Sequence, residues 1–285
     1  MEIENNENIS KFEYSIDKPL YKTKLGELFL VSNKSKPNDN TLYIMKRIKV
    51  KTEEEKNKLF NDIEKIKNIK SKYLIKIYDY FIEHINEEEV ICLILDYLEE
   101  NSSLEKIIYN SSFLTSKNIW KIFIKLLIEI KLIHQNNIQI EKLMPQNIFI
   151  DKKKDIKIGG LTNILDLSKD DTDFSFYQSP EILNGQKLDT KTDMWSLGCI
   201  LYEMAFKKKI FENNKNIIDI NYEIPENAEE DIKNIIAKLI CKHDNRIEAE
   251  KMIFDPIFKK KIIEINLFSE IIQNNIEGKK IYIIV

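Results

Sequence analysis

The sequence predicts an α+β fold with two lobes, in which a small β-rich lobe precedes a larger α-helical lobe. The chain has 285 residues, enough for a large core divided between two lobes. Short apolar segments typical of strands occupy residues 12–96, whereas apolar residues recur at helical spacing after residue 100. We therefore expect one lobe at 12–96 and the other at 97–258.

The first lobe contains four short segments rich in Ile, Leu, Val and Tyr, which predict strands at 28–33, 42–48, 77–82 and 90–96. Thr52 is followed by three glutamates, a typical start of a helix. A threonine hydroxyl accepts a hydrogen bond from a free backbone amide, and acidic side chains favour the positive end of the helix dipole. One helix is therefore expected from Thr52 to about residue 69.

The second lobe shows helical periodicity in three segments, at 115–135, 189–206 and 228–241. Two short strands are expected at 148–150 and 156–158. Outside the lobes, we expect a flexible polar tail at 1–11 and a C-terminal extension at 259–285. That extension is predicted to hold a helix at 261–273 and an apolar strand at 281–285, which either folds back on the domain or pairs with a partner's sheet.

Composition excludes several classes of protein. A net charge of -3 gives no overall basic field for nucleic acid. No apolar run approaches the roughly 20 residues of a membrane span. The three cysteines show no metal-binding spacing and fit a reducing compartment. We expect a cytoplasmic, or alternatively nuclear, protein that has no membrane span and does not bind nucleic acid, with its oligomeric state left open.

Four motifs occur in order in the helical half: Tyr-Gln-Ser-Pro-Glu-Ile-Leu at 177–183, Asp-Met-Trp-Ser-Leu-Gly at 193–198, Arg246, and Asp-Pro-Ile-Phe at 255–258. The order of these motifs resembles that of a eukaryotic protein-kinase domain over residues 12–258. The motif sequences in the helical lobe look most similar to those of the NIMA-related (Nek) group. The resemblance implies a bilobal kinase fold with an ion pair between Glu181 and Arg246. It also implies that Asp193 caps the backbone of the catalytic loop and that Trp195 fills the helical core.

The resemblance places the family's catalytic positions on unusual residues. Lys142 stands where the family has its catalytic aspartate, and an ammonium group accepts a proton near neutral pH only if its pKa falls by several units. Met144 replaces the phosphate-binding lysine, and Gly160 replaces the aspartate that binds magnesium, a cation that prefers carboxylate oxygens. We therefore expect no catalytic side chain at these three positions and no metal ligand set.

The nucleotide positions are kept only in part. The three glycine positions of the family's glycine-rich loop correspond to Tyr21, Thr23 and Gly26, so only one of the three is a glycine. Lys46, Asp62 and Asn147 occupy the family's remaining nucleotide-site positions and form a candidate nucleotide site. The alternative is an ordinary surface lysine and a surface acid. No cofactor is expected, although ATP without magnesium fits these three residues.

The segment 162–179 corresponds to the family's activation loop and contains four aspartates, at 166, 170, 171 and 173. One hypothesis is a loop packed in a single state with an aromatic ring in the cleft, and the alternative is a mobile acidic loop. Glu141 takes the place of the arginine that clamps a loop phosphate in many kinases, so it would repel such a phosphate.

From these departures the sequence predicts a catalytically inactive pseudokinase. It would act as a scaffold or allosteric regulator of partner proteins, an active kinase among the candidates. The first alternative is a sensor that binds nucleotide without metal. The second is a weakly active serine/threonine kinase with rerouted residues, in which Asp155 or Asp166 holds metal beside Asn147.

Overall fold

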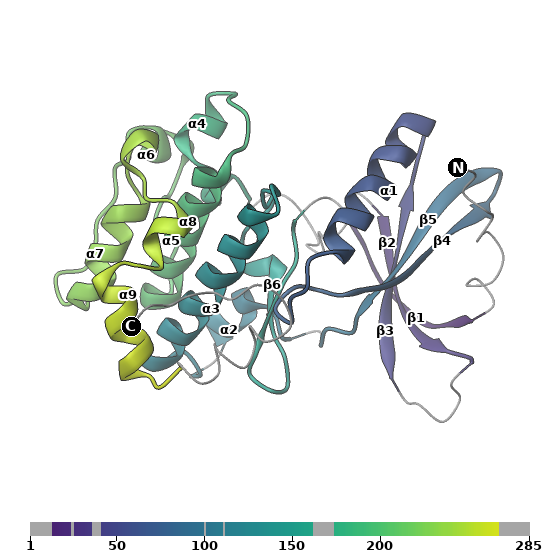
Figure 1. Ribbon diagram of the computed structural model, residues 1–285, viewed down its shortest axis with the longest axis horizontal. Coiled ribbons are helices and arrows are strands. Elements are labelled where there is room, and N and C mark those ends of the chain that lie inside the picture. The colour runs from purple at the N-terminus through teal and green to yellow at the C-terminus, as the bar shows by residue number, and fades with distance from the viewer. Residues whose placement is uncertain are drawn as a thin grey trace.

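The computed structural model confirms the two-lobed α+β fold, with a five-stranded sheet in one lobe and helices in the other (Figure 1). It describes residues 13–23, 26–35, 41–99, 101–110, 112–161 and 174–267. The expected tail at 1–11, most of the activation segment and the expected strand at 281–285 lie outside these ranges.

The sheet is antiparallel with the order β1-β2-β3-β5-β4. Its strands are β1 (Tyr14–Thr23), β2 (Gly26–Asn33), β3 (Leu42–Lys49), β4 (Ile77–Ile85) and β5 (Glu88–Asp96). The sequence predicted the last four but missed β1. This edge strand is largely exposed, contains Pro19 and has two irregularities in its pairing, so it lacks a clear alternation of buried and exposed residues.

The strand period of two gives the sheet two apolar faces. The inner face packs into the core that continues into the helical lobe and carries Ile44 and Ile48 of β3. The outer face has a separate cluster that includes Tyr43 and Met45. Side chains on the inner face of β3 are therefore the ones directed towards the junction of the two lobes.

Helix α1 (Glu53–Lys67) begins as predicted, because the Thr52 hydroxyl accepts a hydrogen bond of 3.1 Å from the Glu55 amide. The chain then returns to the sheet through residues 73–75, which pair with β7 (Ile156–Ile158) of the helical lobe. Ile158 N donates to Tyr73 O at 2.7 Å, and Ile75 N donates to Ile158 O at 3.1 Å. This backbone pairing joins the two lobes.

The helical lobe is built around α3 (Ser116–Gln135) and α5 (Thr190–Phe206), which lie against each other in the core. Around them lie α2 (Leu104–Asn110), α4 (Pro180–Leu183), α6 (Asn214–Ile218), α7 (Glu230–Leu239), α8 (Ala249–Met252) and α9 (Pro256–Glu264). Strands β6 (Ile148–Ile150) and β7 (Ile156–Ile158) match the prediction. Trp195 is fully buried and stacks on Phe211 with ring centroids 5.4 Å apart, as expected for a core residue.

The C-terminal helix starts earlier than the sequence suggested. Helix α9 begins at Pro256 because the Asp255 carboxylate accepts a hydrogen bond from Ile257 N and proline suits the first helical turn. It ends at Glu264, so it crosses the expected boundary at 258. The helix predicted at 261–273 overlaps only its last turn in the described part of the chain.

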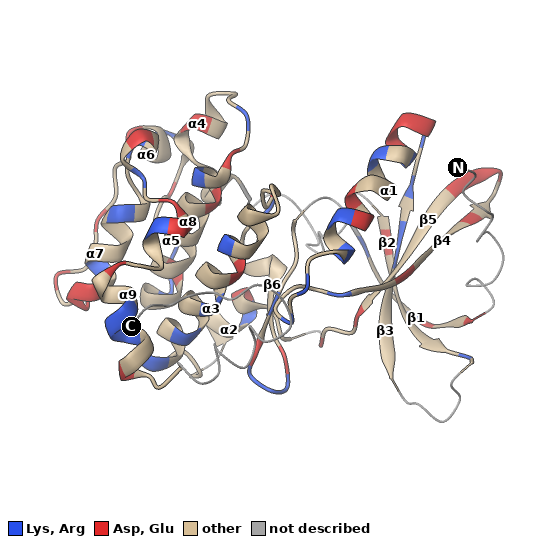
Figure 2. Cartoon of the chain, viewed as in Figure 1, with Lys and Arg blue, Asp and Glu red and all other residues tan. Residues whose placement is uncertain are grey.

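Acidic and basic residues are interspersed over both lobes, and none of the described helices and strands carries basic residues alone along its length (Figure 2). Among the helices that the structure describes, none combines the length and apolar character needed to cross a bilayer.

Candidate functional site

Lys46 lies in the middle of β3 on the inner face of the sheet, between Ile44 and Ile48. Its cross-strand neighbours are Leu28 on β2 and Leu93 on β5. The whole residue is buried, with 0% exposure. A lysine is almost never fully buried unless its ammonium group has a partner, so Lys46 is a candidate functional residue.

The acidic position on α1 does not pair with Lys46. Asp62 is half-buried and forms its ion pair with Lys65 of the same helix, at 3.7 Å. Glu64 is exposed and accepts a hydrogen bond from the Tyr80 hydroxyl at 3.0 Å. The structure gives Asp62 and Glu64 these partners and shows no ion pair between either acid and Lys46, so the role of Asp62 in a nucleotide site stays a prediction.

The Asp193 side chain holds the backbone of the loop at 139–147, as the sequence predicted. Its carboxylate accepts a hydrogen bond of 3.1 Å from Ile140 N and lies 2.7 Å from His134 Nε2. Burial is the largest effect on the pKa of Asp193 and raises it, although His134 and the Ile140 amide act in the opposite direction. His134 was not singled out from the sequence. The one feature of the sequence that could have drawn attention to it is its position, as a single histidine at the end of a long apolar helix.

The loop is also paired with the segment that follows β7. Lys142 N donates to Gly160 O at 2.9 Å, and Glu141 N donates to Leu161 O at 3.3 Å. The Asn147 side chain donates to Lys142 O at 3.2 Å. These bonds hold the backbone of Lys142 and the buried Asn147 in a fixed relation to Gly160.

Gly160 is required by this backbone arrangement. It has a φ of +73°, and a Cβ placed there would lie 2.4 Å from Lys142 O and 3.1 Å from Asn147 Nδ2. A side chain would clash with the loop in this conformation. The glycine in place of a metal-binding aspartate therefore allows residues 142 and 160 to approach closely.

Met144 and Gly26 also have structural explanations. Met144 is fully buried in the main core, so it does not point to a phosphate site. Gly26 begins β2, and a Cβ there would lie 2.0 Å from Arg47 O on β3. The one glycine kept at the positions of the glycine-rich loop thus allows β2 and β3 to approach closely enough to pair.

A carboxylate site for magnesium does not form among the described residues. No group of three or more His, Cys, Asp or Glu side chains is arranged there to hold a metal ion. Asn147 supplies an amide and Gly160 supplies no side chain. Asp155 is engaged elsewhere, because it lies 2.5 Å from Lys125 Nζ and 3.1 Å from Lys72 Nζ. Asp166 lies outside the described residues.

Two buried carboxylates support the segment from 174 to 181. Glu181 receives two hydrogen bonds from the Arg246 guanidinium, at 2.5 and 3.3 Å, as predicted. Burial raises the pKa of Glu181, but Arg246 outweighs it and brings the pKa below its usual value. Glu203 accepts from the hydroxyls of Tyr177 at 2.6 Å and Tyr109 at 2.7 Å. The sequence did not reveal this second cluster, since Glu203 lies within a helix that also carries other polar residues.

The positions of Lys46, Asn147, Asp193, Glu181 and Arg246 in one two-lobed frame agree with a comparison to known families. The family model described as "Protein kinase domain" matches residues 24–258. This chain belongs to the protein kinase domain family. The match covers both lobes of the kinase domain, from just before β2 to the first turn of α9, and leaves out β1.

The curated relatives place this kinase domain close to the Nek kinases. Serine/threonine-protein kinase Nek3 of Oryza sativa subsp. japonica is 24% identical over 278 residues, or 92% of this chain and 46% of the relative. Nek2 of Homo sapiens is 26% identical and covers 72% of this chain and 51% of its own length. Nek11 of Homo sapiens is 30% identical and covers 75% and 34%. The chain spans about half the length of the curated relatives it matches.

These comparisons contradict the expectation of an inactive, non-enzymatic scaffold. The relatives are named serine/threonine-protein kinases, and nothing in the comparisons indicates loss of activity. The expectation was wrong because it judged activity from the residue types at Lys142, Met144 and Gly160. Phosphoryl transfer depends mainly on positioning and electrostatic stabilisation, and the framework that positions the loop is present.

Proposed function

We propose that this kinase domain transfers the γ-phosphoryl group of ATP to serine or threonine hydroxyls of protein substrates. The observation that carries the proposal is the buried Lys46 on the inner face of the sheet. Its ammonium group has the place and the charge to bind nucleotide phosphate. Family membership and the names of the relatives support the same reaction class.

In this proposal the loop around Lys142 contributes charge in place of a carboxylate. Lys142 brings a second cation to a loop whose backbone is fixed by Gly160 and Asp193. A positioned cation stabilises the charge on the phosphoryl oxygens in a loose transition state. The bond from the γ-phosphorus to ADP breaks, the hydroxyl oxygen bonds to phosphorus, and a phosphoryl oxygen accepts the hydroxyl proton.

We also propose that Lys46 and Asn147 contact the nucleotide without a metal held by the described residues. The donors at this site are an ammonium group and an amide, which suit phosphate oxygens better than a hard cation. Asp62 remains a candidate for positioning α1 when nucleotide is bound.

The proposed partners are protein substrates, and the proposed compartment is the cytoplasm or nucleus. Cys92, Cys199 and Cys241 are free thiols, and the first two are buried. Burial raises the pKa of the Cys92 thiol to about 12, so this thiol is protonated and unreactive near neutral pH. Free thiols of this kind fit a reducing compartment.

The proposal is tested by transfer of radiolabelled phosphate from ATP to casein or myelin basic protein. The purified chain is compared with Lys46→Met and with Lys49→Met, which removes an exposed lysine from the same strand. We expect transfer by the wild type and by Lys49→Met, and a loss of at least a hundredfold in Lys46→Met. Equal activity in the two variants would exclude Lys46 as the phosphate-binding residue.

A further inference from the structure

A cavity of about 700 Å³ lies in the helical lobe, between α2 and the turn that connects β6 to β7. This volume is in the range of ligand-binding sites in proteins. The wall of the cavity is held in place by backbone pairing, because Ile150 N donates to Ser102 O at 2.8 Å and Ser103 pairs with Phe149. The residues described above for phosphoryl transfer do not line this cavity.

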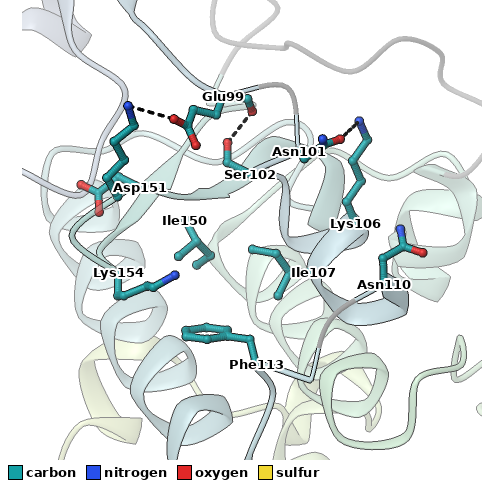
Figure 3. A pocket seen from close by; sticks show the side chains of 11 residues that line it. Glu99, Asn101, Ser102, Lys106, Ile107, Asn110, Phe113, Ile150, Asp151 and Lys154 are labelled. Carbon is teal, nitrogen blue, oxygen red and sulfur yellow. Dashed lines mark hydrogen bonds and ion pairs between the residues drawn. The ribbon is translucent and has the colours of Figure 1, made fainter.

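The floor of the cavity is apolar and its rim is charged (Figure 3). Ile107, Phe113 and Ile150 form the floor, from α2, the segment after α2, and β6. Lys154 crosses above the Phe113 ring, with its Nζ 5.2 Å from the ring centroid and directed towards the middle of the cavity. An exposed ammonium group above an apolar floor suits a ligand that has both an anionic and an apolar part.

The two carboxylates on the rim are already engaged. Glu99 pairs with Lys152 at 3.0 Å. Asp151 accepts hydrogen bonds of 2.8 Å from the backbone amides of Lys153 and Asp155, so it stabilises its own turn. Among the residues that the structure describes, no carboxylate lies within ion-pair distance of Lys154. The local charge therefore favours an anionic group at Lys154.

The backbone of the turn directs Lys154 into the cavity. Lys154 has a φ of +65°, a left-handed conformation that is uncommon for a residue other than glycine. The same turn leaves Lys153 exposed and outside the cavity lining. Two of the three consecutive lysines at 152–154, Lys152 and Lys154, thus line the cavity.

We propose that this cavity binds a short segment of a partner protein, in which an acidic side chain lies close to a large apolar side chain. The acidic group would contact Lys154, and the apolar side chain would pack on Ile107, Phe113 and Ile150. Asn110 on the rim offers an amide with both a donor and an acceptor, which matches a peptide group. Glu99 and Asp151 on the same rim disfavour a nucleic acid or an anionic membrane.

The test uses the full chain without nucleotide, so its outcome is independent of phosphoryl transfer. A phage-displayed library of random dodecapeptides is selected on the wild type, and enriched peptides are measured by fluorescence anisotropy. We expect Asp or Glu within three residues of Leu, Ile or Phe. Lys154→Glu should weaken binding at least tenfold, whereas Lys153→Glu, the same charge change on the same turn, should change it less than twofold.

Three results would overturn the proposal. The first is the absence of any enriched peptide, and the second is enrichment of peptides without an acidic residue. The third is an equal loss of affinity in the Lys153 and Lys154 variants, which would indicate general charge attraction. Phosphatidylserine vesicles serve as a separate probe, and binding of vesicles without binding of peptides would assign the cavity to a membrane surface instead. Circular dichroism of both variants confirms that each is folded.

Discussion

The pair formed by Glu181 and Arg246 gives the sharpest prediction about stability. The Arg246 side chain has 0% exposure, lies 4.9 Å from the Trp195 ring and donates to Glu181, Lys191 O and Cys241 O. Arg246→Met leaves the Glu181 carboxylate buried without its partner. Removal of one member of a buried ion pair costs about 3–5 kcal/mol. We expect a loss in this range for Arg246→Met and for Glu181→Gln.

The double variant should lose less than the sum of the two single losses, because neither charge is then left alone. A coupling of about 2–3 kcal/mol is expected, in the upper range for residues in direct contact. Glu248→Gln is the control: Glu248 pairs with Lys251 at 3.7 Å on the surface, and its removal should cost less than about 1 kcal/mol.

The assay is urea unfolding followed by tryptophan fluorescence. Both tryptophans of the chain, Trp120 and Trp195, lie in the helical lobe, so the signal reports on the lobe that holds the pair. The lowered pKa of Glu181 also predicts a pH dependence: its contribution is present above its ordinary pKa and is lost as the pH falls through the lowered value. Single losses below 1 kcal/mol, or additive losses, would refute the reasoning.

Two further predictions concern the loop and the junction of the lobes. Gly160→Ala should destabilise the domain by about 1–3 kcal/mol, because the new Cβ would clash with Lys142 O. An unchanged melting temperature would contradict the close approach of residues 142 and 160. Burial raises the pKa of Glu129 to about 7, against the weaker effects of Ser71 and Lys157. Above pH ~4.5 the folded state keeps a proton that the unfolded state releases, so the free energy of unfolding falls by about 3 kcal/mol as the pH rises from ~4.5 to 7. Glu129→Gln should remove this fall in urea titrations between pH 5 and 8, and a variant with the wild-type pH profile would exclude Glu129 as its source.

The sequence predicted the elements whose signals are local. Thr52 begins α1, Thr115 caps α3 and Asp189 caps α5, each with a side-chain hydrogen bond to a backbone amide. The spacing of apolar residues along the sequence then located the main helices and the inner strands. Strand β1 was missed because an exposed edge strand with Pro19 has no clear apolar alternation.

The site was predicted less well, because its geometry depends on contacts distant in sequence. Asp193 and the Glu181–Arg246 pair were inferred from motifs, yet His134 and Glu203 were not, since their partners lie 59 and 26 residues away. The reason for Gly160 becomes visible only when Lys142 O lies beside it. Residue types alone also gave the wrong conclusion about activity, because they do not report how the loop is positioned.

The central claim is that this kinase domain transfers phosphate from ATP with Lys46 as the phosphate-binding cation. The most direct measurement is the rate of radiolabelled transfer by purified wild type and Lys46→Met, each with magnesium and with EDTA. We predict transfer by the wild type under at least one of these conditions and at least a hundredfold less by Lys46→Met. Absence of transfer by the wild type under both conditions, or equal transfer by the variant, would contradict the account.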